Sequence, residues 1–136
     1  MIINRHGDFD APELYRLLKS GGVFITEQVG GDNDRDLVEQ VLPGTPKPFP
    51  HLNLKEQRKA FEDAGFQILR AEEAYRPIVF YDVGEFVWFA HVIEWEFQGF
   101  SVEKCMGNLL EMQNNLERDG KIEGTIHRYL IVAGKL

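Results

Sequence analysis

The sequence has little cysteine, no long apolar run and no excess of positive charge, and each shortage excludes a class of protein. A single cysteine among 136 residues forms no internal disulfide and favours a reducing compartment. No apolar run approaches the length of a membrane span, and the first residues lack the regions of a signal peptide, so we expect a cytoplasmic protein with no membrane contact. The net charge of −7 argues against a nucleic-acid surface on this chain, because phosphate binding requires clustered Lys and Arg.

Metal-binding patterns are also missing. The histidines show no ligand spacing, and we expect no metal site; they are His6, His51, His91 and His127. The acidic run 32–36 lacks the oxygen spacing and distal Glu of a calcium loop, which favours a solvated run that caps a helix. Cys105 falls on a helical pattern with Leu109 and Met112, which favours a core position over a catalytic thiol.

Capping signals and apolar spacing predict alternating strands and helices in one domain covering residues 1–136. We expect strands near 1–6, 23–26 and 125–133, a strand that starts at 66–69 and continues through Glu72 and Glu73 into a more exposed region, and helices near 10–18, 36–42, 53–64, 82–93 and 101–118. Leu14, Leu17 and Leu18 are expected to form the buried stripe of the first helix, which Gly21 or Gly22 would end. The order is that of an α/β fold in which helices cover a mostly parallel sheet.

A long polar segment separates the second strand from the next predicted long helix. Residues 30–50 contain prolines at 43, 46, 48 and 50. A connection of this length inside a compact domain is typically a binding loop or a lid.

Several phrases of the sequence resemble class I S-adenosylmethionine-dependent methyltransferases. "ELYRLLKSGGVFITEQVG" resembles the helix, glycine turn and fifth strand of that family, with Ser20 in place of the usual proline. "IINRHGDF" is similar to the fourth strand, "EQRKAFEDAGFQIL" to the fifth helix and sixth strand, and "IHRYLIVAGK" to the seventh. The segment "YDVGEFVWFAHVIEWEFQGFS" resembles an insertion between strands six and seven in a bacterial branch of the family.

The resemblance implies the C-terminal half of a Rossmann-like methyltransferase sheet. It would contain strands four, five, six and seven, the last antiparallel, with covering helices and a helical insertion at 82–120. The Gly-rich turn after strand one and the acidic residue after strand two, which bind the cofactor in that family, are missing. We therefore interpret the chain as a fragment that is inactive alone, and assign none of its residues to binding S-adenosylmethionine.

Polar residues follow the predicted strand ends, where ligands of parallel sheets bind. Asn4 and Arg5 are predicted to orient the substrate, with His6 as a general base; ordinary turn residues are the alternative. Glu27 and Gln28 should point to opposite faces of their strand, and we favour Gln28 for substrate binding.

Aromatic residues are concentrated between positions 75 and 100. Core packing explains most of them, whereas a cap over an apolar substrate is the functional alternative. Trp95 and Phe97, in the loop after a predicted helix, are the candidates for a substrate wall.

The resemblance leaves the methyl acceptor undetermined, whether small molecule, RNA or protein. One alternative is a standalone, non-catalytic binding module derived from a methyltransferase fold. Another is a different small α/β enzyme that uses His6 and Glu27. In the family, strand four pairs with strand one, so the first strand of this chain would be an open edge. We expect either self-association through this strand or a disordered first strand.

Overall fold

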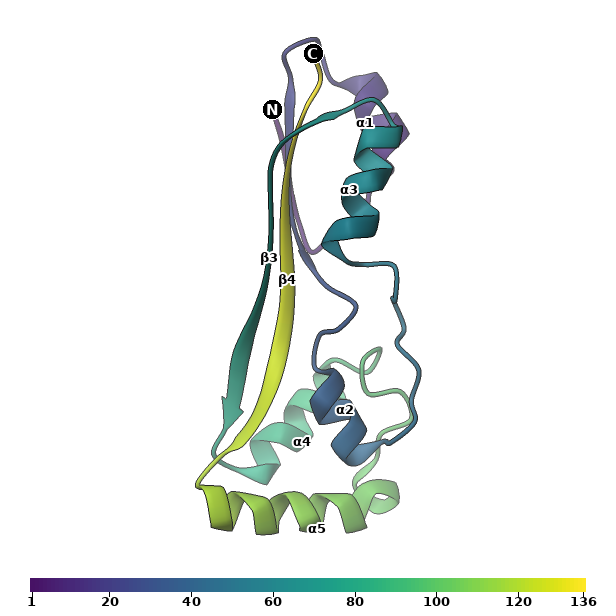
Figure 1. Cartoon of the computed structure of the whole chain (residues 1–136). Helices are drawn as coiled ribbons and strands as arrows, with labels where there is room; N and C mark the ends of the chain where they lie inside the picture. Colours follow the sequence, from purple (N-terminus) through teal and green to yellow (C-terminus); the bar gives the residue numbers. More distant parts are fainter. The chain divides into compact units, whose positions relative to one another are not determined.

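The computed structural model describes all residues from 1 to 136, and the chain divides into two compact units. Unit 1 comprises Met1–Gly31, Phe49–Tyr75 and His127–Leu136, and unit 2 comprises Asp32–Pro48 and Arg76–Ile126. The elements, labelled in Figure 1, are β1 (Ile2–Arg5), α1 (Ala11–Leu17), β2 (Val23–Val29), α2 (Arg35–Val41), α3 (Leu54–Asp63), β3 (Gln67–Phe80), α4 (Val83–Val92), α5 (Val102–Asp119) and β4 (Ile122–Gly134). No helix combines the length and the apolar character needed to cross a membrane.

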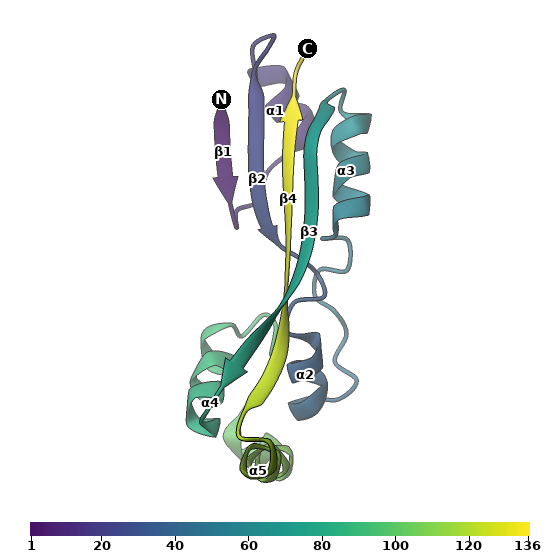
Figure 2. The same ribbon diagram turned by 60° about the vertical axis from the view of Figure 1, so that its left-hand side comes forward.

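Unit 1 is built on a mixed sheet with the strand order β1-β2-β4-β3. β1 and β2 are parallel, with Ile3 opposite Ile25, and α1 is the crossover between them, as the sequence predicts. The last strand, β4, pairs antiparallel with β2, and Gln28 lies opposite Tyr129. Figure 2 shows β3 beside β4 and running in the opposite direction. The α/β class is therefore confirmed, with a four-stranded mixed sheet.

Two helices, α1 and α3, lie on the same side of this sheet (Figure 1). Phe61 of α3 is fully buried against Phe24 of β2 and Phe66, and Tyr129 and Ile131 of β4 belong to the same core. The other face of the sheet carries no helix of unit 1. Ile3 is 67% exposed there, so one apolar face of unit 1 is only partly covered.

Unit 2 contains a second apolar core formed by α2, α4 and α5. Leu37, Phe86 and Cys105 are almost completely buried in it, which confirms Cys105 as a core residue. A Cβ atom on Gly124 would lie 2.4 Å from Leu37 Cδ1, so only glycine allows this strand to approach α2 so closely. The predicted insertion 82–120 falls within this unit.

Local signals predicted the helix starts well. The side chains of Asp10, Asn53, Asp82 and Ser101 each accept a hydrogen bond from the backbone N–H three residues later. Gly120 ends α5 in the left-handed conformation, with a φ of 76°.

Two local expectations were wrong. Helix α1 ends at Leu17 with Leu18 as its extended C-cap, before the glycines, and Leu17 is 56% exposed instead of buried. Strand β3 runs to Phe80, well beyond Glu73, the last residue that the sequence indicated for it. Its charged residues and Pro77 concealed the strand signal, but both are acceptable at the edge of the sheet, where β3 lies.

Candidate functional site

A network of side-chain amides joins the C-terminal halves of β1 and β2. Asn4 Oδ1 accepts hydrogen bonds from Thr26 Oγ1 at 3.1 Å and from Gln28 Nε2 at 2.7 Å. Gln28 Nε2 also lies 2.8 Å from the carbonyl oxygen of Gly7, in the loop after β1. Thr26 and Gln28 are buried because strand alternation turns both toward the helix-covered face.

This network has one donor group and one acceptor without a partner. Asn4 Nδ2 donates no hydrogen bond, and Gln28 Oε1 accepts none within the structure. The two side chains fix each other's orientation while each keeps a polar atom available. Such a pair can orient a ligand that offers both an acceptor and a donor.

The opposite face of the same strand ends carries charged side chains. Glu27 lies 3.5 Å from Arg5 Nε and 3.6 Å from His6 Nε2, and all three side chains are substantially exposed. His6 has a φ of 54°, in the left-handed region that non-glycine residues rarely adopt. Backbone strain of this kind occurs often at functional sites, which fits the position of His6 directly after β1.

A histidine–glutamate pair connects β3, β4 and the start of α3. His127 is fully buried, and its Nε2 lies 2.8 Å from Glu73 Oε2. The same carboxylate oxygen accepts the backbone N–H of Leu54, in the first turn of α3, at 3.0 Å. The ring of Tyr75 stacks on His127 with centroids 4.4 Å apart. Sequence reasoning missed this cluster, because its residues lie 54 positions apart in the chain.

Tyr129 is 2% exposed, and its hydroxyl group has no hydrogen-bond partner. Burial, and secondly the charge of Glu73, raises the pKa of Tyr129 to about 12. A buried hydroxyl group without a hydrogen-bond partner lowers the stability of the fold, because water hydrates this group in the unfolded chain.

The raised pKa predicts a loss of stability in alkaline solution. The unfolded chain loses the Tyr129 proton near its ordinary pKa of 10.0, whereas the folded chain keeps it until about 12. Between these values the unfolded state binds fewer protons, so the free energy of unfolding falls as pH rises, by about 3 kcal/mol over the interval. Urea unfolding measured across this pH range should show the decrease in the wild type and a smaller one in Tyr129→Phe. Equal slopes in the two proteins would contradict the assignment.

The glycine pair after β2 is packed against the chain itself. A Cβ atom on Gly30 would lie 2.0 Å from His127 Nδ1, and one on Gly31 would lie 2.2 Å from the carbonyl oxygen of Phe49. Atoms of His127 and Phe49 therefore occupy the space that a side chain at these two positions would need. These two glycines do not fit the role of a cofactor cradle.

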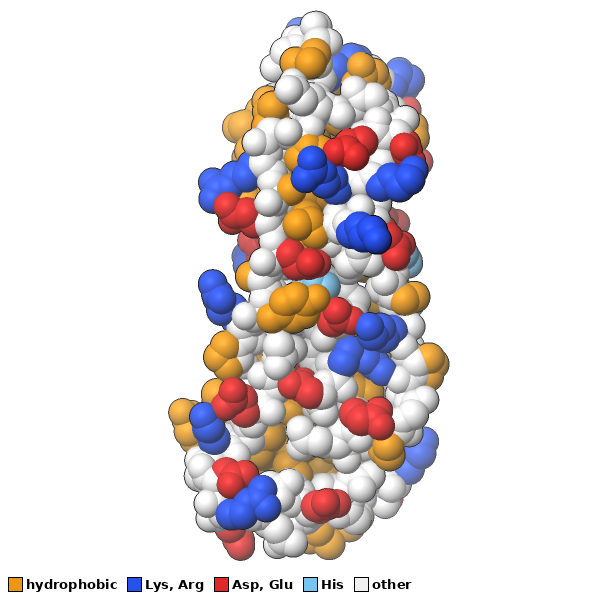
Figure 3. Space-filling model, in the orientation of Figure 1, with side chains coloured by type: hydrophobic (Ala, Val, Ile, Leu, Met, Phe, Trp, Pro, Cys, Tyr) orange, Lys and Arg blue, Asp and Glu red, His pale blue; other side chains and the backbone are white.

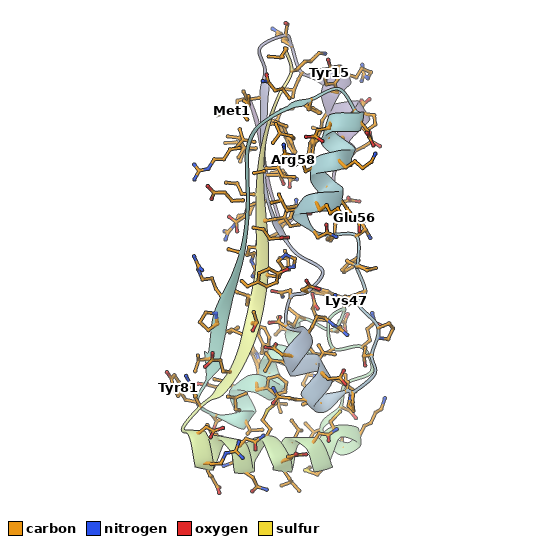
Figure 4. All side chains as sticks on the ribbon, in the orientation of Figure 1. Met1, Tyr15, Lys47, Glu56, Arg58 and Tyr81 are labelled. Atoms are coloured by element: carbon orange, nitrogen blue, oxygen red, sulfur yellow. The ribbon has the colours of Figure 1, made fainter.

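The aromatic candidates of unit 2 lie in different environments. Phe97 is 1% exposed and packs against Phe86 at 5.6 Å between ring centroids, so it is part of the core. Trp95 is 52% exposed and remains accessible. Tyr81, directly after β3, is also exposed (Figure 4). Trp88 on α4 is exposed as well. The structure thus places Trp95, but not Phe97, where a ligand can reach it.

The acidic run after Gly31 also differs from expectation. Asp34 is fully buried and has a φ of 57°, and Asn33 is 6% exposed, so this part of the run is not solvated. Asp36 accepts hydrogen bonds from the N–H and hydroxyl groups of Thr125, which fixes the start of α2 on β4. No group of three or more His, Cys, Asp or Glu side chains is arranged to hold a metal ion.

Charged side chains are mixed by sign on the face of the molecule that Figure 3 shows. Lys and Arg side chains alternate there with Asp and Glu, and none of the basic groups forms an extended patch. On α3, for example, Arg58 pairs with Glu62 and Lys59 pairs with Asp63. This face therefore offers no continuous basic surface of the kind that binds nucleic-acid phosphates.

Known proteins similar to this chain are found among solved structures. No family model and no curated protein matches the sequence. A candidate methyltransferase from Bacillus halodurans C-125 aligns with a TM-score of 0.50 and 16% identity, over 92% of this chain and 56% of that protein. At this identity the likeness shows a shared fold, a methyltransferase-like α/β fold, and the chain spans little more than half of that protein's length.

Two further structures align less closely. The [4+2]-cyclase SpnF aligns with a TM-score of 0.41 and 18% identity, over 92% of this chain and 43% of that one. Phosphoethanolamine N-methyltransferase 2 from Haemonchus contortus, in complex with phosphomonomethylethanolamine and S-adenosylhomocysteine, aligns with a TM-score of 0.39 and 17% identity, over 92% and 29%. The chain covers less than half of either protein.

Proposed function

We propose that residues 1–136 form the C-terminal part of an S-adenosylmethionine-dependent class I methyltransferase. In this proposal β1, β2, β3 and β4 are strands four, five, six and seven of the family's sheet. The observation that carries it is the strand order β1-β2-β4-β3, in which the last strand is inserted antiparallel beside β2. A simple α/β chain would place β3, not β4, beside β2, so this order is a specific feature.

The uncovered surfaces of unit 1 support the proposal. β1 pairs with β2 on one side only, and Ile3 is 67% exposed on the face without helices. Further strands beside β1 and helices over this face would complete an α/β sheet covered on both sides. The remaining part of the methyltransferase would supply both.

The strand ends of unit 1 would then contact the methyl acceptor. Asn4 and Gln28 hold each other and would orient the acceptor through their unpaired amide atoms. Arg5 and His6 directly follow Asn4 in the chain, and their side chains lie beside Glu27 on the opposite face of the strand ends. An acceptor that extends across these ends would contact them, and His6 would accept its proton. In unit 2, Trp95 is exposed and stays a separate candidate for substrate binding, whereas Phe97 is buried in the core and is not part of this assignment. Methyl transfer depends mainly on proximity and alignment, which a rigid pair such as Asn4–Gln28 favours.

Binding of the cofactor product tests the proposal. Because Gly30 and Gly31 pack against His127 and Phe49, we expect no micromolar affinity of this chain for S-adenosylhomocysteine. Calorimetric titration of the 136-residue protein measures it, and micromolar binding would contradict a cofactor site outside these residues. The gene sequence directly upstream gives a second test: an in-frame glycine-rich turn supports the proposal, whereas a stop codon there favours a standalone binding module.

The open edge of β1 predicts self-association of the chain alone. An exposed edge strand offers unpaired N–H and C=O groups to a second copy, and Ile3 adds an apolar contact. Light scattering should show species larger than a monomer, and Ile3→Lys should reduce them. Leu17→Lys is the matched control, because Leu17 is 56% exposed on α1, away from the edge. A monomeric wild type, or equal effects of the two variants, would argue against pairing through β1.

A further inference from the structure

We propose that Glu73 and Tyr129 form a binding site for a primary alkylammonium group, a function that does not depend on methyl transfer. The two residues belong to unit 1 and lie on adjacent strands, β3 and β4. The sequence did not indicate either residue as part of a binding site, because the two are brought together only by the pairing of distant strands.

The position of Tyr129 beside Glu73 follows from the neighbouring contacts. Tyr75 stacks on His127, and His127 Nε2 is bonded to Glu73, so these side chains share one face of the sheet. β3 and β4 run in opposite directions (Figure 2). Two residues beyond His127 on β4 therefore come level with two residues before Tyr75 on β3. These positions are Tyr129 and Glu73, and both side chains point to the same face.

Each residue has a polar atom without a partner at this place. Both hydrogen bonds to the Glu73 carboxylate, from Leu54 N and His127 Nε2, end on Oε2, which leaves Oε1 without a bond. Tyr129 Oη is buried and also has no partner. The Glu73 side chain is 29% exposed, so a ligand can reach this carboxylate from solvent.

The chemistry of the two atoms selects the ligand. A carboxylate oxygen is an acceptor, and a phenol oxygen can accept as well as donate, so the ligand must offer N–H or O–H donors. The first turn of α3 donates the N–H of Leu54 to Glu73 Oε2, and the remaining carboxylate oxygen selects a cationic ligand. The effect of the Glu73 charge on the pKa of Tyr129 also places the two groups within electrostatic range. A primary ammonium group supplies both the charge and more than one donor.

Three probes of similar size separate charge from hydrogen bonding. n-Propylamine at neutral pH is a primary ammonium, 1-propanol has a donor without charge, and tetramethylammonium has charge without a donor. Each is titrated into the full chain while the backbone amide NMR signals of Leu54, Glu73 and Tyr129 are followed. We expect saturable shifts at these residues with propylammonium and weaker binding, by about tenfold or more, of the other two probes.

Variants assign the binding to the two residues. Glu73→Gln should weaken propylammonium binding by about tenfold, and Tyr129→Phe by about fivefold. Glu72→Gln is the matched control, because Glu72 is the exposed neighbouring carboxylate, paired with Arg70, and should change binding less than about twofold. Tyr129→Phe removes a hydroxyl group without a hydrogen-bond partner, so this variant should be at least as stable as the wild type. It therefore still tests the site if Glu73→Gln does not fold.

Several results would overturn the proposal. Propanol binding as tightly as propylammonium would remove the role of charge, and equal binding of tetramethylammonium would remove the role of the donors. An equal loss in Glu72→Gln, unchanged binding in Tyr129→Phe, or no saturable shift at these residues would each show that the site does not exist. Failure of this test leaves the proposed methyltransferase assignment unaffected, because that rests on strand order.

Discussion

Replacing Gly30 by alanine is expected to lower the free energy of unfolding by about 3 kcal/mol. The added Cβ would lie 2.0 Å from Nδ1 and 2.2 Å from Cε1 of the buried His127 ring. The ring has no room to yield, because Glu73 holds its Nε2 and Tyr75 stacks on its face. The methyl group must therefore displace His127 and break a contact that joins β3, β4 and α3.

Gly107→Ala provides the matched control for this experiment. A Cβ on Gly107 meets no atom within 4 Å, and the residue lies inside helix α5. Alanine there should raise stability by about 1 kcal/mol, because it favours the helix over the unfolded chain. Urea unfolding followed by far-UV circular dichroism is suitable, since both tryptophans, Trp88 and Trp95, belong to unit 2 and do not report directly on Gly30. A neutral Gly30→Ala would show that His127 is not held as described.

The Phe61→Ala variant should lose about 4 kcal/mol of stability. Phe61 is fully buried in the unit 1 core, with ring centroids 5.3 Å from Phe9, 5.8 Å from Phe24 and 5.4 Å from Phe66. Truncation removes a large apolar side chain and leaves a cavity that aromatic rings on three sides cannot close. The side chain also fixes α3 on the sheet, and the first turn of α3 donates a hydrogen bond to Glu73.

Phe49→Ala makes the same chemical change at a less buried position. Phe49 is 40% exposed, so the same truncation should cost about 1 kcal/mol or less. Both variants can be compared with the wild type by urea unfolding and circular dichroism. Similar losses for the two would mean that Phe61 does not occupy the core described above, whereas loss of the Leu54 to Glu73 hydrogen bond in Phe61→Ala alone would support the link between the core and the site.

The amino-acid sequence alone predicted the helix starts and the α/β class. Asp10, Asn53, Asp82 and Ser101 act on N–H groups only three residues away, so their capping role depends little on the rest of the fold. The sequence predicted the length of an element less well where contacts with a distant segment set that length. β3 runs to Phe80 because it is held beside β4, and its own charged residues and Pro77 give no sign of this length.

The polar residues of unit 1 also divide into those that the sequence indicated and those that only the fold brings together. Asn4 and Gln28 could be selected because each follows an apolar strand, and parallel pairing brings such ends together. His127, Glu73 and Tyr129 could not be selected, because no local pattern records that β4 passes between β2 and β3. Gly30 begins the polar segment after the second predicted strand, and only the packed His127 ring explains why this residue must be glycine. Sequence determined what each segment forms, since capping and periodicity act over a few residues; strand order decided which polar groups meet, since that depends on contacts between distant segments.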